Sequence, residues 1–159
     1  MATFTPKKFI AHIHSIANSF NADVNDALMD SAIAAEDHFD ETFDDEGFND
    51  GGFVEPWAPL KPSTIEGKGH DKILKNTGKL RRSRTKRILP PSSGGRIARV
   101  SYNTSYAKLH NRGGKNKQGY NIPARKFIGT SKVLNGRIRS ILKNRINRLF
   151  NKNFSIGRL

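Results

Sequence analysis

Residues 24–46 read VNDALMDSAIAAEDHFDETFDDE, a stretch that combines an apolar helical face with a dense cluster of carboxylates. Small and apolar side chains recur here at intervals of three and four residues, as on the buried face of a helix. They are Val24, Ala27, Leu28, Ser31, Ala32, Ala35, Phe39 and Phe43. The spacing predicts a helix of about five or six turns that ends before Gly47, because glycine readily adopts the left-handed conformation that closes helices.

The last turns of this helix carry acids that its own dipole disfavours, since the carboxyl end of a helix is its negative end. These acids are Glu36, Asp37, Asp40, Glu41, Asp44, Asp45 and Glu46. We therefore expect basic side chains from elsewhere to lie close to this end of the helix.

A second helical pattern precedes the first. Thr5 and Pro6 form a typical helix start, with a capping hydroxyl followed by a proline that is tolerated at the first helical position. Apolar side chains then recur at helical spacing; they are Phe9, Ile10, Ile13, Ile16, Ala17 and Phe20. The sequence thus predicts two N-terminal helices.

The remaining segments predict a mixture of short strands and helices. Residues 47–72 are expected to form a long loop with one short helix from Pro62. Strands ending at Leu89 and starting at Ile97 flank a turn at residues 90–95 and predict a hairpin. Residues 122–128 are expected to be extended, with an edge strand at Pro123, because proline cannot donate to a strand ladder.

The chain ends in a further helical pattern behind a cap at Thr130 or Ser131. The predicted class is α+β, with two N-terminal helices and a C-terminal helix packed on a small, mostly antiparallel sheet. We expect one domain over residues 1–159. Its parts are an acidic helical part (6–46), the long loop (47–72), a basic β-rich part (73–129) and the C-terminal helix (130–151).

Charge is strongly segregated along the 159 residues, whose net charge is +14. Residues 1–55 carry twelve acids and two bases, and residues 56–159 carry two acids and 26 bases, so the two parts have net charges of −10 and +24. Such a basic segment repels itself unless an anionic partner lies beside it. The partner is a nucleic acid, an acidic protein or the acidic part of another copy, unless these cations are simply solvated.

Several classes of function lack their required residues. The chain has no cysteine, which excludes disulfides and thiolate metal sites and is typical of a reducing cytosol. Its five histidines fit no metal motif, and no nucleophile–base pair is recognisable. We expect no enzyme, metal or cofactor. An apolar run of membrane-spanning length and a signal peptide are both missing, so we expect no membrane partner.

Five short motifs occur in an order that carries a family resemblance. They are Trp57-Ala58-Pro59-Leu60; Ile73-Leu74 with Thr77-Gly78-Lys79-Leu80 and Ser83; Tyr106-Ala107 with His110; Gly113-Gly114; and Ile122-Pro123-Ala124-Arg125 with Phe127-Ile128-Gly129. Together with the C-terminal helix, this set resembles the phage virion morphogenesis family, the tail completion proteins of tailed phages. The resemblance covers residues 24–150. A heavier basic run at residues 81–87 and Lys61-Pro62 before the short helix depart from the family pattern.

The resemblance implies a structural virion protein that completes the tail or joins head and tail at the neck. Related neck and tail-terminator proteins form rings, commonly hexameric, around the channel through which DNA leaves. It implies that the partners are further copies of the chain, connector, neck or tail-tube proteins, and DNA bound without sequence specificity. It also implies virion localisation after assembly in the host cytoplasm, and it brings no catalytic residues. The alternative is a basic accessory protein that binds nucleic acid without sequence specificity.

The motif residues are expected to have structural roles. Trp57 is expected to fill the core beneath the long loop, with docking into a neighbouring subunit as the alternative. Thr77 is expected to form a cap or a tight turn, and Leu80 is expected to pack in the core. His110 is expected to be a hydrogen-bonded structural residue on the same side of a helical turn as Tyr106. The full set is Trp57, Pro59, Leu60, Thr77, Gly78, Leu80, Tyr106, Ala107, His110, Gly113, Pro123, Ala124 and Arg125.

A second set of residues is expected to supply charge at subunit contacts or toward DNA. It comprises Asp40, Glu41, Asp44, Asp45, Arg81, Arg82, Arg84, Lys86, Arg87, Arg145 and Arg148. An acidic and a basic surface on each subunit would complement one another in a head-to-tail ring.

Overall fold

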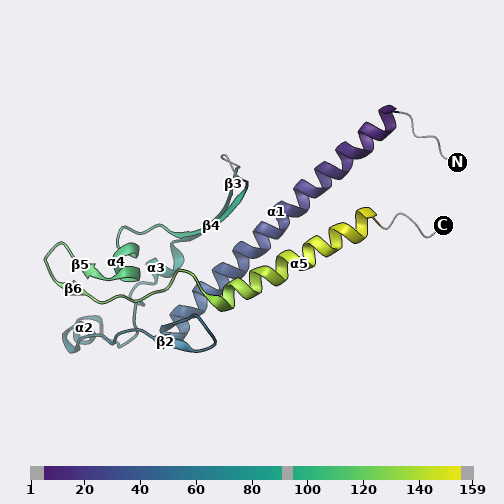
Figure 1. The fold of residues 1–159 in the computed structure, drawn as a ribbon. Coiled ribbons are helices and arrows are strands. Elements are labelled where there is room, and N and C mark those ends of the chain that lie inside the picture. Colours follow the sequence, from purple (N-terminus) through teal and green to yellow (C-terminus); the bar gives the residue numbers. More distant parts are fainter. Residues whose placement is uncertain (1–5, 91–94, 155–159) are drawn as a thin grey trace.

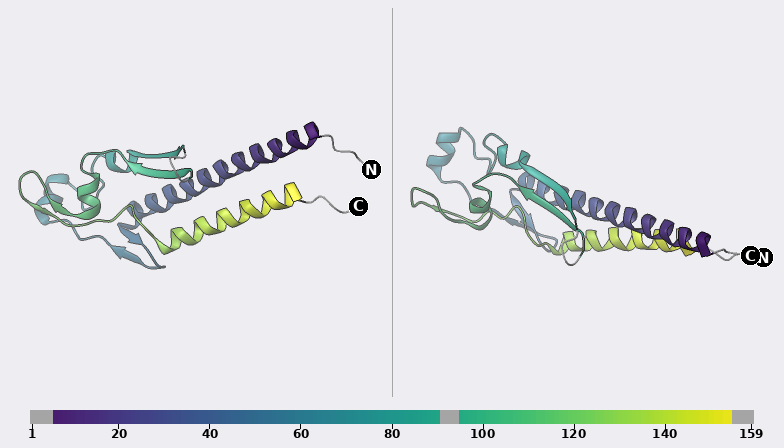
Figure 2. Two further views of the ribbon diagram at one scale, coloured as in Figure 1. Left: turned by 45° about the horizontal axis from the view of Figure 1, so that its top comes forward. Right: turned by 90° about the horizontal axis from the view of Figure 1, so that it is seen from above.

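The computed structural model describes residues 6–90 and 95–154 and shows an elongated molecule (Figure 1). Helices α1 (Pro6–Asp45) and α5 (Lys132–Phe154) lie side by side in opposite directions and form an arm (Figures 1 and 2). The residues between them form a compact head, which lies at the end of the arm opposite Pro6 and Phe154 (Figure 1). The α+β class is confirmed.

The two predicted N-terminal helices are one continuous helix of 40 residues. Residues 21–23 join the two apolar patterns and contain neither glycine nor proline, so no residue there interrupts the backbone hydrogen bonds. Ile13, Phe20 and Ala27 are spaced by seven residues and therefore lie on the same face. At 1.5 Å per residue, α1 is about 60 Å long.

The head contains short elements joined by turns. They are β1 (Gly47–Asn49), β2 (Val54–Pro56), α2 (Pro62–Lys68), α3 (Lys79–Arg82), β3 (Arg84–Leu89), β4 (Ile97–Tyr102), α4 (Ala107–Arg112), β5 (Gly114–Lys115) and β6 (Asn121–Ile122). The predicted short helix from Pro62 and the predicted hairpin are confirmed, although residues 91–94 of its turn lie outside the described residues.

Within the described ranges the strands form three separate antiparallel pairs, β1–β2, β3–β4 and β5–β6, instead of the single small sheet that we predicted. Two of the pairs have strands of only two or three residues, too short to gather further strands. The predicted edge strand ends at Ile122, because Pro123 has no N–H to donate. The segment predicted as a long loop contains β1, β2 and α2.

Trp57 lies in the core of the head and is only 6% exposed. Its ring meets Phe43 edge to face at 5.7 Å, and its Nε1 donates a hydrogen bond to the Lys126 carbonyl at 2.7 Å. Phe43 and Phe127 are completely buried beside it. One side chain therefore joins the end of α1, the segment after β2 and the segment before α5.

The first turn of α5 is attached to the β1–β2 hairpin. Ser131 Oγ donates to the Asn49 carbonyl at 2.9 Å and accepts from the Leu134 N–H at 3.2 Å, as a helix cap does. The carboxylate of Asp50 accepts from the Lys132 N–H at 3.0 Å. The expected cap at Ser131 is thus present, and these bonds fix the hairpin relative to the arm.

We predict that Trp57→Ala lowers the free energy of unfolding by about 3–5 kcal/mol, the range for large-to-small changes in a core. Urea unfolding monitored by circular dichroism measures the difference. Phe53→Ala is the matched control, since Phe53 is an aromatic residue near Trp57 in sequence but is 70% exposed. Equal stabilities of the two variants would contradict a core role for Trp57.

Candidate functional site

The acidic end of α1 is paired with cations that follow it in the same chain. Arg81 donates to both carboxylate oxygens of Asp40, at 2.8 and 2.6 Å, and to Asp44 at 2.7 Å. Arg84 bridges Glu36 and Asp40, and Lys86 pairs with Glu36. The basic side chains expected near the carboxyl end of α1 are therefore present.

These contacts keep the carboxylates ionised. Hydrogen bonds from Arg81 hold the pKa of Asp40 and of Asp44 below the ordinary value. The hydrogen bond from Lys86, with help from Arg84, holds the pKa of Glu36 below its ordinary value against the opposing effect of burial. The same pairing raises the pKa of Arg81.

Strand alternation divides the basic run at residues 81–87 between two faces. In β3, Arg84 and Lys86 point toward α1, where they meet its acids. Arg87 lies on the opposite face, directly across from Arg99 of β4. The run is therefore not a continuous stripe of cations available to phosphate groups.

Other charges that we expected between subunits also have partners inside the chain. Arg145 donates to Asp30 at 2.6 Å and ties α5 to α1, and Arg137 lies 3.5 Å from Glu41. Arg82 donates to the Thr77 carbonyl at 2.6 Å. Asp45, Arg87 and Arg148 differ: they are exposed and have no ion-pair partner among residues 6–90 and 95–154. These three remain candidates for contacts with other molecules.

The motif residues converge on one region of the head. Arg125, only 6% exposed, donates to the carbonyls of Ala58 and Pro59 at 2.9 and 3.2 Å, and its own N–H donates to the His110 carbonyl at 2.7 Å. Gly113 has a φ of 71°, and a Cβ there would lie 2.8 Å from the backbone nitrogen of Ala124. The motifs around Trp57, His110 and Arg125 thus meet through backbone contacts that depend on these residue types.

The Thr77–Gly78 motif forms the tight turn that we expected. Gly78 has a φ of 70° and precedes α3, and the Thr77 hydroxyl accepts weakly from the Lys79 N–H at 3.4 Å. Leu80, at 4% exposure, packs in the same cluster as Trp57 and Ala107. This turn therefore places Arg81 next to the acids of α1.

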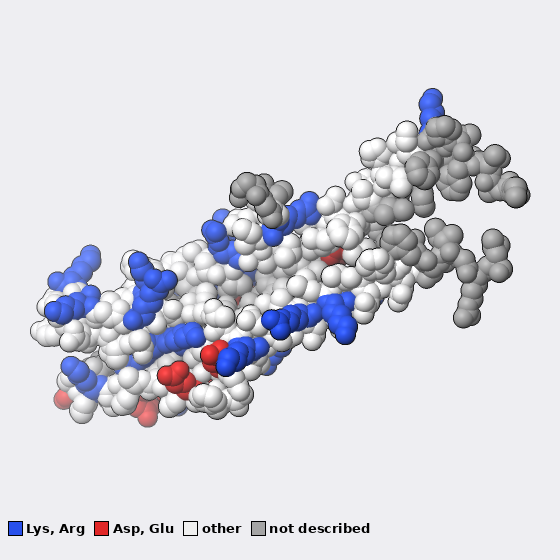
Figure 3. Space-filling model, viewed as in Figure 1, with Lys and Arg blue, Asp and Glu red and all other residues white. Residues whose placement is uncertain are grey.

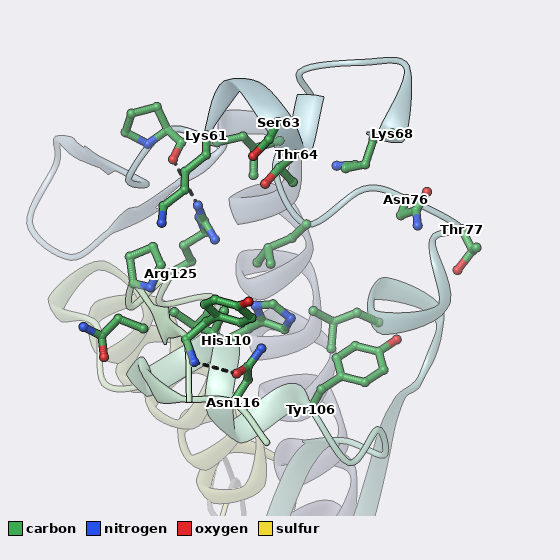
Figure 4. A pocket seen from close by; sticks show the side chains of 18 of the residues that line it. Lys61, Ser63, Thr64, Lys68, Asn76, Thr77, Tyr106, His110, Asn116 and Arg125 are labelled. Atoms are coloured by element: carbon green, nitrogen blue, oxygen red, sulfur yellow. Dashed lines mark hydrogen bonds between the residues drawn. The ribbon is translucent and has the colours of Figure 1, made fainter. Parts of the chain in front are cut away.

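A cavity of about 810 Å³ opens beside these motifs. Figure 4 shows Lys61, Thr64 and Lys68 on one side of it and Tyr106 and His110 on the opposite side. Among the residues that the structure describes, the lining includes four cations and no carboxylate. These cations are Lys61, Lys68, Lys79 and Arg125. The floor is apolar; Leu60, Leu74, Leu80 and Ile122 contribute to it.

Desolvation acts on the charged groups of this cavity. Burial lowers the pKa of Arg125 and of Lys68, and burial together with the charge of Arg125 lowers the pKa of His110. The ring of His110 meets Tyr106 edge to face at 5.7 Å, on the side that we expected. Its buried Nδ1 has no hydrogen-bond partner in the described part of the chain. The cavity therefore suits an occupant that brings negative charge.

Sequence reasoning missed Asn111, which lies between His110 and Gly113 in one of the motifs. Its Oδ1 accepts from the N–H groups of Phe127 and Ile128 at 2.8 and 3.1 Å, and its Nδ2 donates to the Ile128 carbonyl at 3.0 Å. Its position inside the motif was the available signal. The Asn111 side chain therefore makes the backbone hydrogen bonds to residues 127 and 128 that a neighbouring strand would otherwise make.

The described ranges offer neither a metal site nor a membrane-spanning helix. They contain no group of three histidine or acidic side chains arranged to hold a metal ion. None of their helices is long and apolar enough to cross a membrane.

We predict that Arg81→Met reduces the dependence of stability on pH in the acid range. The pKa values of Asp40 and Asp44 are lowered on folding, so their stabilisation is complete above about pH 4, the unfolded value, and is lost as pH falls through the folded values. Urea unfolding between pH 2 and 5 measures the slope. Arg87→Met removes an exposed cation that has no acid partner among the described residues, so it should keep the wild-type slope. Equal slopes in all three proteins would refute the prediction.

Comparison with known families agrees with the motif pattern. The model of the phage virion morphogenesis family matches residues 8–147, which include nearly all of α1, the whole head and most of α5. Searches of curated proteins and of solved structures gave no match. The resemblance drawn from the motifs is confirmed over most of the chain, and the protein belongs to the phage virion morphogenesis family.

Proposed function

We propose that this protein completes the tail or joins head and tail in a phage virion, as a homo-oligomeric ring around the DNA channel. Family membership supports a structural role in virion assembly. What we propose beyond this role is the position at the neck or tail terminus and the assembly into a ring. The support for both comes from the exposed side chains of the arm.

The supporting observation is an apolar stripe on α1 that a single chain covers only in part. Ala27 and Ser31 are 5% and 6% exposed on the half of α1 where Arg145 of α5 is bound to Asp30. On the other half, Ile13 and Phe20 continue the same face and are 48% and 54% exposed. Large apolar side chains repeated along one face mark a protein interaction surface.

A second copy of the chain is the occupant that we propose for this stripe. The α5 side of the arm presents Arg139, Lys143 and Arg148, which are exposed and have no acid partner in the described residues. On α1, Asp37 and Asp45 are likewise exposed and unpaired within those ranges. Neighbouring arms in a ring would bring these opposite charges together farther along the arms than the apolar contact, which favours correct registration.

The outer face of the β3–β4 hairpin supports contact with DNA. Arg87 and Arg99 are directly opposite one another, and like charges in this position destabilise a strand pair. Two phosphate groups, one bound by each arginine, would relieve that repulsion. Lys and Arg are also more widely visible than Asp and Glu on the face drawn in Figure 3. The same observation supports the alternative function, a basic accessory protein that binds nucleic acid without sequence specificity.

We predict that particles made without this protein have unjoined or incomplete tails, and that the purified wild-type protein restores infectivity in extracts. Ile13→Asp/Phe20→Asp should fold normally, because both positions are about half exposed, but fail to restore infectivity. Electron microscopy and plaque counts measure the two effects.

The matched control for this experiment is Ile33→Asp. Ile33 is 41% exposed on a different face of the same helix, so its replacement should leave restoration intact. Complete tails and infectious particles without the protein would refute the proposed function. Normal restoration by the double variant would refute the contact through the arm.

We predict that the protein binds duplex DNA of any sequence and that Arg87→Ala/Arg99→Ala lowers the slope of log K against log salt by about 2, since each phosphate contact contributes roughly 0.9. Fluorescence anisotropy over a salt series measures the slope. Lys86→Gln, a change on the inward face of the same strand, should keep the wild-type slope. A strong preference for one duplex sequence would contradict both candidate functions.

A further inference from the structure

We propose that the cationic cavity of one subunit receives the tip of the β1–β2 hairpin, residues 50–55, from the next copy in the ring. This inference rests on the proposed ring and specifies one of its subunit contacts. The proposed contact joins the exposed hairpin tip of one copy to the open cavity of the next.

The hairpin tip is an apolar knob with acids on both sides. Phe53 is 70% exposed, and Val54 beside it is 38% exposed. Glu55 is an exposed acid beside them, and Asp50 on the other side keeps its negative charge while it accepts from the Lys132 N–H. Residues 49–56 contain no lysine or arginine. Gly51 and Gly52 leave the turn before Phe53 free of bulky side chains. An aromatic ring that is mostly exposed contributes little packing to its own subunit.

The cavity has the complementary character. Its floor includes Leu60, Leu80 and Ile122, which provide apolar surface for an aromatic ring. Lys61 and Lys79 line the same cavity, and none of its described lining residues is a carboxylate. An apolar floor with cations around it suits an acidic peptide that carries an aromatic anchor.

The knob of a subunit is held away from its own cavity. Ser131 and Lys132 of α5 bind Asn49 and Asp50, so the hairpin lies against the start of the arm. Residues of α2, α3, α4 and the β5–β6 hairpin line the cavity. Figure 1 shows α2, α4 and the β5–β6 hairpin on the side of the head away from the arm, and the β1–β2 hairpin next to the arm. Contact between two different surfaces is heterologous, and it repeats from copy to copy until a ring closes.

Cysteine cross-linking tests this contact directly, because the natural chain has no cysteine. Phe53→Cys should form a disulfide with Asn76→Cys or Tyr120→Cys, two exposed positions that line the cavity, provided that the Cα atoms approach within about 7 Å. Double variants should give a ladder of linked chains that ends at the ring. A mixture of two single variants should give only linked dimers. Phe53→Cys with Arg99→Cys, a position on β4 outside the cavity, is the control and should give no ladder.

Self-association provides a second measurement. Phe53→Asp should weaken it at least tenfold in sedimentation experiments, because a central aromatic anchor is lost. Phe53→Leu, which keeps an apolar anchor, should retain most of it. Both variants should unfold like the wild type, since Phe53 is exposed.

The outcomes separate this contact from the ring itself. Rings that form without cross-links in both double variants, or rings that persist in Phe53→Asp, would overturn the contact while the proposed function stands. Cross-links in the Phe53→Cys single variant would show that the hairpin tips of two copies contact each other. That result would also overturn the contact between tip and cavity. Protection of Asn76→Cys from maleimide by a DNA oligonucleotide, with unchanged association of Phe53→Asp, would assign the cavity to nucleic acid instead. Wild-type protein that neither assembles nor enters particles would refute the proposed function.

Discussion

The pairing of Arg81 with Asp40 and Asp44 is the interaction on which the arrangement of head and arm depends. The acids lie at the negative end of α1, where only nearby cations make them favourable. The guanidinium group binds both oxygens of Asp40 and also donates to Asp44. Since Arg84 and Lys86 extend this pairing along Glu36 and Asp40, the contact is a network, which contributes more than isolated surface ion pairs.

This network also sets the direction of the β3–β4 hairpin. Because Arg84 and Lys86 must face α1, residues of the other parity, including Arg87, must face away. Val100 and Tyr102 of β4 lie across from Lys86 and Arg84 and pack toward α1 with them. The cations of this hairpin that can bind another molecule are therefore those, such as Arg87, that do not pair with the acids of α1.

The head has little regular secondary structure, and side chains bonded to backbone groups hold it together. Trp57 bonds the Lys126 carbonyl, Arg125 bonds two carbonyls after β2, and Asn111 pairs with the segment at Phe127 and Ile128. Such contacts satisfy buried polar groups that strands would otherwise pair. They hold the cavity and the exposed hairpin tip in fixed positions relative to one another, which is what the proposed ring would require.

The sequence by itself determined the local elements and the family. Helical spacing, the cap at Ser131, the start at Pro62 and the paired strands around residues 84–102 were predictable, because each depends on neighbours within a few residues. The continuity of α1 was also readable locally, since residues 21–23 contain neither glycine nor proline. Tertiary structure alone decided the division of the basic run and the partners of Asp40 and Arg145. A charge count gives the signs that must be balanced, but the partner of each charge depends on which segments pack together. The cavity likewise exists only where α2, α3, α4 and the β5–β6 hairpin meet, through contacts between residues far apart in the chain.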